Sequence, residues 1–91
     1  MLTETQYHLV KTIQNWDKST TPPTAYFISR KMDMSVSNTH LNLRILTELG
    51  LVIRRKYVLE GKARLVRTIY AIDDVVADIY LKTYEKLHSS D

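Results

Sequence analysis

The chain has 91 residues, of which 44% are hydrophobic and 25% charged, and its formal net charge is +3. A chain of this length buries only about 60–65% of the surface that its unfolded form exposes, which excludes large catalytic folds and predicts one domain over residues 1–91. The composition is that of a globular protein and not of a disordered chain. Because the chain has no cysteine, disulfides, thiolate metal sites and thiol redox chemistry are excluded.

The sequence gives no sign of a membrane or export segment. Its longest uncharged apolar run is far shorter than the roughly 20 residues that a membrane helix needs. Its first residues lack the basic start and apolar stretch of a signal peptide. We therefore expect a soluble cytoplasmic protein, nucleoid-associated in a prokaryote or in the host cytoplasm if viral.

The charge is distributed unevenly along the chain. Residues 26–70 hold nine basic and three acidic residues, a net of +6, whereas residues 71–91 hold five acidic residues and two lysines, a net of −3. Basic blocks of this kind attract polyanions, either nucleic acid or an anionic membrane. The alternative is that these residues only form solvated faces.

A first helix is predicted from Thr3 to about Asp17. Its apolar residues recur at a spacing of three, and the stripe consists of Tyr7, Val10, Ile13 and Trp16, flanked by Leu2 and Leu9. Thr3 is the expected N-cap. Residues 17–23, which include two prolines, predict a loop.

A second, short helix is predicted from Thr24 to about Met32. Thr24 is the candidate N-cap, and Thr21 followed by Pro22 at the first helical position is the rival start. Asp33 and Met34 would then form a turn.

A third helix is predicted from its N-cap Ser35 to about Leu49. Its buried stripe would be Thr39, Leu43 and Leu46, and Gly50 occupies the place of a left-handed C-terminal cap. The opposite face would carry Ser37, His40, Leu41 and Arg44, with Asn38 and Asn42 at its edge.

A β-hairpin is predicted after the third helix. Two runs rich in β-branched residues, Leu51–Leu59 and Leu65–Ile72, are separated by Glu60-Gly61-Lys62. The pattern leaves open which face of the hairpin points inward. Leu51, Ile53, Tyr57 and Leu59 favour one face, whereas Val52 and Val58 favour the other.

A last helix is predicted from Asp73 to about His88, beyond a core that spans about residues 3–72. Its apolar stripe would consist of Val76, Ile79, Thr83 and Leu87, widened by Val75, Tyr80 and Tyr84. Such a stripe needs a cover, because large exposed apolar patches usually mark interfaces. One prediction is a two-fold homodimer whose interface is formed by Leu2, Tyr7, Val76, Ile79, Tyr80, Thr83 and Leu87. The alternative is that this helix folds back on the first helix of the same chain.

The stretch from Ile28 to Val52 resembles the winged helix-turn-helix of bacterial and archaeal transcription regulators, and is similar to the MarR and ArsR groups. Ser29 is the small residue of the second helix, Met34 precedes the capping Ser35, and residues 46–52 match the closing Leu-x-x-x-Gly-Leu-Val pattern. The resemblance covers about Thr3 to Ile72. It implies an α+β, mostly helical fold with a three-helix core, a two-stranded β-wing and an added C-terminal helix. Asp33 departs from it by replacing a common glycine, and the wing lacks the acid-rich loop of many MarR proteins.

The residue types on the third helix are suited to reading DNA. An α-helix fits the major groove, where Asn pairs with adenine, Arg with guanine, and Leu contacts a thymine methyl. The predicted base-reading set is Ser37, Asn38, His40, Leu41 and Arg44. Phosphate contacts are expected from basic residues of the second helix and of the wing. The predicted backbone set is Arg30, Lys31, Arg54, Arg55, Lys56, Lys62, Arg64 and Arg67.

Each of these features also has a simpler interpretation. Arg44 is four residues from Glu48 and could form a helical ion pair. The wing basics could protect a strand edge from pairing. The aromatic residues Tyr7, Trp16, Tyr80 and Tyr84 are better explained by packing than by a ligand cavity.

Catalysis and metal binding have no support in the sequence. His8, His40 and His88 lack the spacing of metal ligands, and neither a phosphate-binding loop nor a nucleophile with its base is present. We therefore expect neither an enzyme nor a metal or other cofactor.

These observations predict a dimeric, sequence-specific double-stranded DNA-binding transcription regulator, a repressor that acts by occlusion on a pseudo-palindromic site. The alternatives are a winged-helix protein-interaction module and a replication or architectural nucleic-acid-binding subunit.

Overall fold

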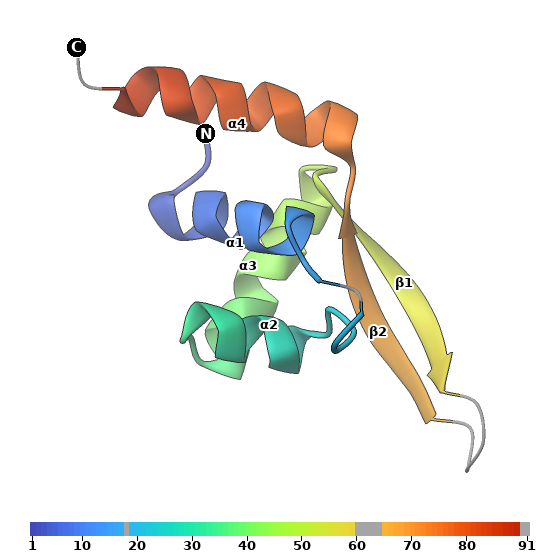
Figure 1. The fold of residues 1–91 in the computed structure, drawn as a ribbon. Coiled ribbons are helices and arrows are strands. Elements are labelled where there is room, and N and C mark those ends of the chain that lie inside the picture. The colour runs from blue at the N-terminus through green and yellow to red at the C-terminus, as the bar shows by residue number, and fades with distance from the viewer. Residues whose placement is uncertain (18, 60–64, 90–91) are drawn as a thin grey trace.

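A computed structural model describes residues 1–17, 19–59 and 65–89, in which three helices precede a two-stranded antiparallel sheet and a last helix follows it (Figure 1). The elements in chain order are α1 (Glu4–Gln14), α2 (Ala25–Met32), α3 (Val36–Glu48), β1 (Val52–Leu59), β2 (Leu65–Ile72) and α4 (Asp74–His88). This order confirms the predicted α+β fold with an added C-terminal helix.

The helices begin where short polar side chains cap them. Thr3, Thr24, Ser35 and Asp73 have extended backbones, and each side chain accepts a hydrogen bond from a backbone N–H two or three residues later. These bonds satisfy N–H groups that the first helical turn leaves unpaired. The three predicted caps, Thr3, Thr24 and Ser35, are confirmed. The rival start of α2 at Thr21 is wrong, because the carbonyl of Pro22 instead accepts a bond from Thr24 N at 2.8 Å.

Helix α1 ends at Gln14, three residues before the predicted end. Trp16, just beyond the helix, packs against the core, and its indole Nε1 donates to the carbonyl oxygen of Thr21 at 2.6 Å. A buried indole N–H needs such an acceptor. This bond ties the loop to the end of α1.

The turn between α2 and α3 is built on Asp33, which adopts left-handed backbone angles (φ 54°, ψ 49°). The N–H of Met34 donates to the carbonyl of Ser29 at 2.9 Å, and the N–H of Asp33 donates to that of Arg30 at 3.2 Å. This pair of bonds is a Schellman motif, which glycine usually closes and which Asp tolerates better than most residues. Helix α3 ends in the same way at Gly50 (φ 84°), as predicted.

The core lies between α1, α2, α3 and the start of β1. Thr39, Leu43 and Leu46 of α3 are at most 1% exposed, which confirms the predicted buried stripe. The other apolar core residues outside α4 are Leu2, Leu9, Val10, Ile13, Ala25, Ile28, Leu51, Val52 and Tyr70. Because α3 packs on α2 and on β1, these two elements set its orientation.

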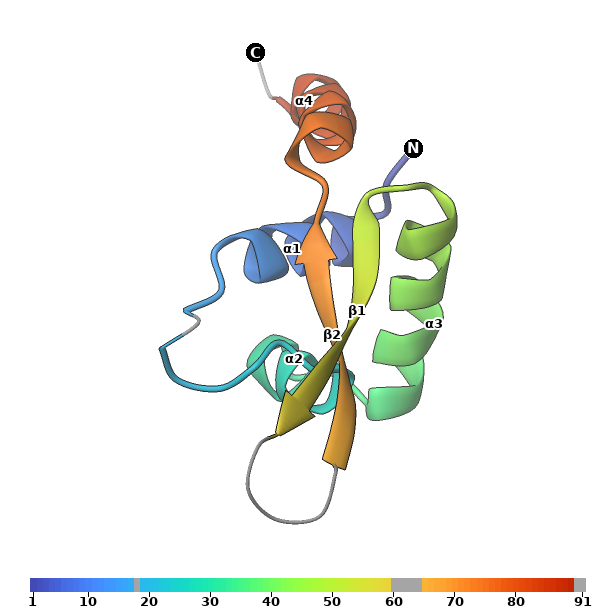
Figure 2. The ribbon, with the colours of Figure 1, turned by 90° about the vertical axis from the view of Figure 1, so that its right-hand side faces the viewer.

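The strands pair in a continuous antiparallel register from Val52 opposite Ile72 to Leu59 opposite Leu65. At the base of this hairpin, Val52 and Tyr70 are buried, whereas Ile53 and Tyr57 are at least one-third exposed. The inward face at the base of the hairpin is therefore that of Val52, one of the two alternatives that the sequence left open. Beyond its base the hairpin leaves the core and projects as a wing (Figure 2).

The loop before α2 attaches the wing to the helices. Thr24 forms an isolated antiparallel bridge with Ile69, and Tyr70 N donates to the carbonyl of Pro23 at 3.0 Å. Asp73 N also donates to the carbonyl of Leu51 at 2.8 Å, which closes the base of the hairpin. These backbone bonds fix the angle between the wing and the three helices.

Helix α4 lies along α1 of the same chain, the alternative to pairing with a symmetry mate (Figure 1). The rings of Tyr7 and Tyr84 stack with centroids 4.2 Å apart. The Tyr7 hydroxyl donates to Glu85 Oε2 at 2.6 Å, and Gln14 Nε2 donates to Asp74 Oδ1 at 3.1 Å.

The buried face of α4 differs from the predicted stripe. Ala77, Leu81 and Tyr84 are buried, Val76 and Tyr80 are half-buried, and the exposed apolar side chains are Val75, Ile79 and Leu87. Leu2 and Tyr7, predicted at a dimer interface, take part in the packing of this chain, and Leu2 is only 3% exposed. The apolar residues of α4 cover more than one face of the helix, and contact with α1 buries one of these faces.

Candidate nucleic-acid interface

The beginning of α3 and the wing extend toward one end of the molecule, and α4 lies at the other end (Figure 2). This arrangement follows from the turn at Asp33, which places α3 across α2, and from the backbone bonds that hold the wing. The predicted site residues on α3 and the wing thus share one side of the fold.

The predicted base-reading face of α3 is open to solvent along its length. Ser37, Asn38, His40, Leu41 and Arg44 are all exposed, while Thr39 and Leu43 between them are buried. Leu41 is 48% exposed. The face therefore offers an apolar group among hydrogen-bonding groups.

An open groove of about 750 Å³ separates α3 from the inner face of the wing. It brings together four of the predicted reading residues and Arg54, and its lining consists of Ser37, His40, Leu41, Arg44, Thr47, Glu48, Arg54, Thr68 and Tyr70. Sequence reasoning missed Thr47, Glu48, Thr68 and Tyr70. Knowledge of the strand register would have placed Tyr70 and Thr68 on this face of the wing, because Tyr70 pairs with Arg54 and Thr68 pairs with Lys56.

The basic residues of the wing lie on both of its faces. Arg54 and Lys56 share the face of Val52, which is turned toward α3, whereas Arg55 and Arg67 lie on the opposite face. All four are exposed. Lys62 and Arg64, predicted near the tip, lie outside the described residues. A wing with cations on two faces can meet phosphates on either side of it.

Helix α2 adds a cation held by an aromatic ring. Arg30 Nη1 donates to the hydroxyl of Tyr26 at 3.0 Å, and its guanidinium carbon lies 5.8 Å from the ring centroid. This hydrogen bond raises the pKa of Arg30 above its ordinary value. The sequence did not single out Tyr26, although its position four residues before Arg30 places both on one face of a helix.

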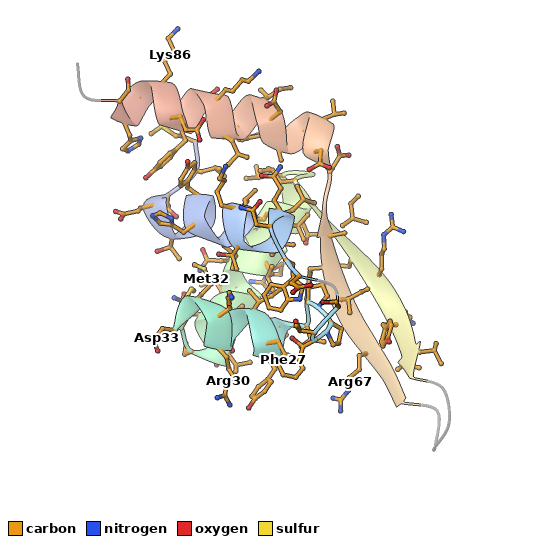
Figure 3. All side chains as sticks on the ribbon, viewed as in Figure 1. Phe27, Arg30, Met32, Asp33, Arg67 and Lys86 are labelled. Atoms are coloured by element: carbon orange, nitrogen blue, oxygen red, sulfur yellow. The ribbon has the colours of Figure 1, made fainter. Side chains whose placement is uncertain are left out.

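Arg30 and Arg67 extend toward the same edge of the molecule, away from α4 and its Lys86 (Figure 3). A second groove of about 540 Å³ runs between the start of α2 and β2, and Tyr26, His40 and Arg67 line it. The exposed Lys31 follows Arg30 in the last turn of α2. The predicted backbone residues that the structure describes thus surround the reading face on two sides.

The cations of this surface are not neutralised within the described part of the chain. From residue 26 to residue 70 the described segments hold seven lysines and arginines, all exposed, and two acidic residues, Asp33 and Glu48. Among the described residues the ion pairs within 4 Å are His8–Glu4 and Lys82–Asp78. Arg44 is in neither pair, so the predicted alternative of an ion pair with Glu48 is not formed. The positive field is available to a polyanion.

In residues 1–17, 19–59 and 65–89, no group of three or more His, Asp or Glu side chains could hold a metal ion. No helix in the same part is long and apolar enough to cross a membrane.

Comparison with known proteins identifies the fold. No family model matches the sequence, and no curated protein matches it. Among solved structures, the chain is similar to Lactococcus lactis ZitR, which is described as a zinc-responsive MarR family member. The TM-score is 0.61 and the sequence identity is 18%, and the match covers 96% of this chain and 61% of the ZitR chain. ZitR in complex with DNA gives a TM-score of 0.59 at 18% identity over 96% of this chain and 60% of that one.

A third similar structure is a possible transcriptional regulator from Methanosarcina mazei Go1. Its TM-score is 0.60 at 18% identity, over 94% of this chain and 73% of that one. The chain spans about three fifths of the length of the ZitR chains. These likenesses establish a winged helix-turn-helix fold of the kind found in MarR-family regulators, with β1–β2 as its wing.

Proposed function

We propose that the chain is a double-stranded DNA-binding transcription regulator that places α3 in the major groove. The observation that carries the proposal is the exposed polar face of α3, bordered on both sides by cations that no described acidic residue pairs with. Helix α3 has the dimensions that the major groove admits, and its first turns lie nearest the base edges. The DNA complex of the similar ZitR structure supports DNA as the partner.

The division of labour follows from side-chain chemistry. Base edges would be contacted by Arg44, Asn38 and Leu41. Arginine pairs with guanine, an amide pairs with bases that offer acceptors or donors, and leucine contacts the thymine methyl group. The wing cations and Arg30 with Lys31 would meet phosphates, which carry charge but no sequence information. Affinity and its salt dependence would come mainly from the second set, and sequence preference from the first.

We propose further that the protein acts as a homodimer on a pseudo-palindromic site. The exposed side chains Val75, Ile79, Thr83 and Leu87 recur every four residues and form one stripe along α4. Val76 and Tyr80 border that stripe and are half-buried. A second copy placed about a two-fold axis would cover the stripe and set two recognition helices about one turn of DNA apart. Repression by occlusion of the polymerase is the simplest mechanism for such a dimer.

A selection from a random duplex library at two salt concentrations tests this proposal. We expect enrichment of an inverted repeat with half-sites roughly ten base pairs apart, bound more weakly at the higher salt. Salt-sensitive binding without enrichment would favour an architectural or replication subunit. Absence of binding at both salt concentrations would refute the proposal and favour a protein-interaction module.

Two matched arginine variants test the division of labour. Arg44→Ala should reduce discrimination at one base pair of each half-site by about 1–3 kcal/mol. Arg67→Ala should weaken binding to all sequences evenly and lower the slope of log K against log salt by about one unit per site. Anisotropy titrations of both variants on one duplex and its single-base substitutions would measure these effects. Identical behaviour of the two variants would refute the assignment of separate roles.

A further inference from the structure

A chain of side-chain amides connects the first turn of α1 to the reading face of α3. Gln6 and Asn42 are 7% and 9% exposed, and Gln6 Nε2 donates to Asn42 Oδ1 at 3.3 Å across 36 residues of sequence. The other buried polar side chains, Ser29 and Thr39, donate to backbone carbonyls of their own helical segments. The Gln6–Asn42 bond thus joins α1 to α3, whereas the hydroxyl groups of Ser29 and Thr39 form hydrogen bonds only within their own helical segments.

The direction of every bond in this amide chain is set by backbone groups at its two ends. The N–H of Thr3 can only donate, and it donates to Gln6 Oε1 at 3.1 Å, so Gln6 must turn Nε2 toward Asn42. The carbonyl of Asn38 can only accept, and it accepts from Asn42 Nδ2 at 2.9 Å. A carboxamide has one accepting and one donating end, so these two fixed partners leave one orientation for Gln6 and one for Asn42.

The same constraint passes to the side chain of Asn38. Asn42 Nδ2 also donates to Asn38 Oδ1 at 3.2 Å. The oxygen of the exposed Asn38 amide is thereby held toward Asn42. Its Nδ2 has no hydrogen-bond acceptor among the described residues and is left for a partner outside the chain.

We infer that Asn42 and Gln6 are positioning residues that present Asn38 to DNA as a hydrogen-bond donor, an inference that rests on the proposed function. An unrestrained amide rotates to offer either its donor or its acceptor, and so discriminates poorly between bases. A fixed donor favours base edges rich in acceptors, namely guanine O6 and N7 or thymine O4, and disfavours the amino group of cytosine. The buried amides therefore contribute to sequence preference although they lie under the reading face.

The test begins with the base preferences of the wild-type protein and of Asn38→Ala, which identify the base pair that Asn38 reads. We expect that position to favour guanine or thymine over cytosine. The variant Asn42→Leu keeps the branching and the four heavy atoms of the side chain and removes the amide. It should reduce the preference at that position by about fivefold, the worth of one net hydrogen bond, and leave the other positions unchanged. Gln6→Met removes the donor at the far end and should have a smaller effect in the same direction.

A double-mutant cycle separates positioning from a general loss of structure. In the Asn38→Ala background, Asn42→Leu should have no further effect on base preference, because the group that it orients is absent. Ser29→Ala is the matched control, since it removes a buried polar group that does not contact Asn38. It should change the thermal midpoint without changing base preference. If Asn42→Leu does not fold, Gln6→Met supplies the same cycle.

The outcomes distinguish this inference from the proposed function. If the wild-type protein enriches no sequence, the proposed function fails and this inference fails with it. If the wild-type protein is selective but Asn42→Leu and Gln6→Met retain its full preference at the Asn38 position, only the positioning role is refuted. Equal effects of Asn42→Leu with and without Asn38 would also refute it.

Discussion

The attachment of α4 to α1 rests mainly on Tyr84, so Tyr84→Ala should destabilise the protein strongly. Tyr84 is 8% exposed and is stacked between Tyr7, at 4.2 Å, and His88, at 3.9 Å between ring centroids. Losing the burial of an aromatic side chain costs about 2 kcal/mol, and losing a stacked partner adds about 1 kcal/mol. The free energy of unfolding should therefore fall by about 3 kcal/mol, which lowers Tm by more than about 10 °C in a chain of this size.

The assay is thermal and urea unfolding followed by circular dichroism, with Ile79→Ala as the matched control. Ile79 lies on the same helix but is 63% exposed, so its truncation should change the free energy of unfolding of the isolated chain by less than about 0.5 kcal/mol. A Tyr84→Ala protein within 0.5 kcal/mol of wild type would refute the account of α4 packing.

The same pair of variants tests the proposed dimer. A dimer that buries the α4 stripe makes Tm depend on protein concentration, because association stabilises the folded state by mass action. Ile79→Ala should then abolish that dependence while leaving the low-concentration Tm unchanged. A wild-type Tm that is independent of concentration, together with a monomeric sedimentation coefficient at tens of micromolar, would refute the dimer.

Three other variants test local features. The hydrogen bond to Glu85 raises the pKa of Tyr7, so the folded state holds the phenolic proton more tightly than the unfolded state does. The stability that this bond adds is fully present below the pKa of Tyr7 in the unfolded chain. It is lost as the pH rises through the pKa of Tyr7 in the folded chain. The stability advantage of wild type over Tyr7→Phe should thus disappear in urea titrations above pH 10, and an advantage that persists there would contradict this assignment. Gly50→Ala should cost about 1–2 kcal/mol from its positive φ alone, because an added Cβ meets no atom within 4 Å, and a larger loss in thermal melts would indicate a clash instead. Asp33→Gly should change stability in the opposite direction by less than about 1 kcal/mol, whereas a loss on this substitution would show that the Asp side chain contributes more than its backbone angle costs.

Most of the secondary structure could be predicted because its determinants are local. Thr3, Thr24, Ser35 and Asp73 cap helices with hydrogen bonds that span two or three residues, so a short window of sequence contains both partners. Thr39, Leu43 and Leu46 reveal the buried face of α3 because they recur at spacings of four and three residues, which places them on one side of a helix. The basic composition of the wing was likewise readable without a structure.

The exposure of the predicted reading face could be predicted for the same reason, but the groove could not. Exposure of Arg44 and its neighbours follows from the buried stripe on the opposite side of one helix. Tyr70 and Thr68 enter the groove only because the strands pair in a register that sets them beside Arg54 and Lys56. Strand register depends on the turn and on packing against the helices, and apolar residues on both faces of the hairpin left it undetermined.

Helix α4 and the amide chain show what tertiary structure alone decided. The apolar residues of α4 cover more than one face, and the stacking of Tyr84 on Tyr7 selected which of them is buried. Gln6 and Asn42 are ordinary polar residues in the sequence, and their hydrogen bond exists only because α1 and α3 cross at that point. The sequence by itself therefore determined where helices begin, where strands lie and where the charge is, since those depend on neighbours a few residues away. The choice of buried face, the groove and the orientation of Asn38 depend on contacts between residues far apart in the chain, which form only when the helices pack together.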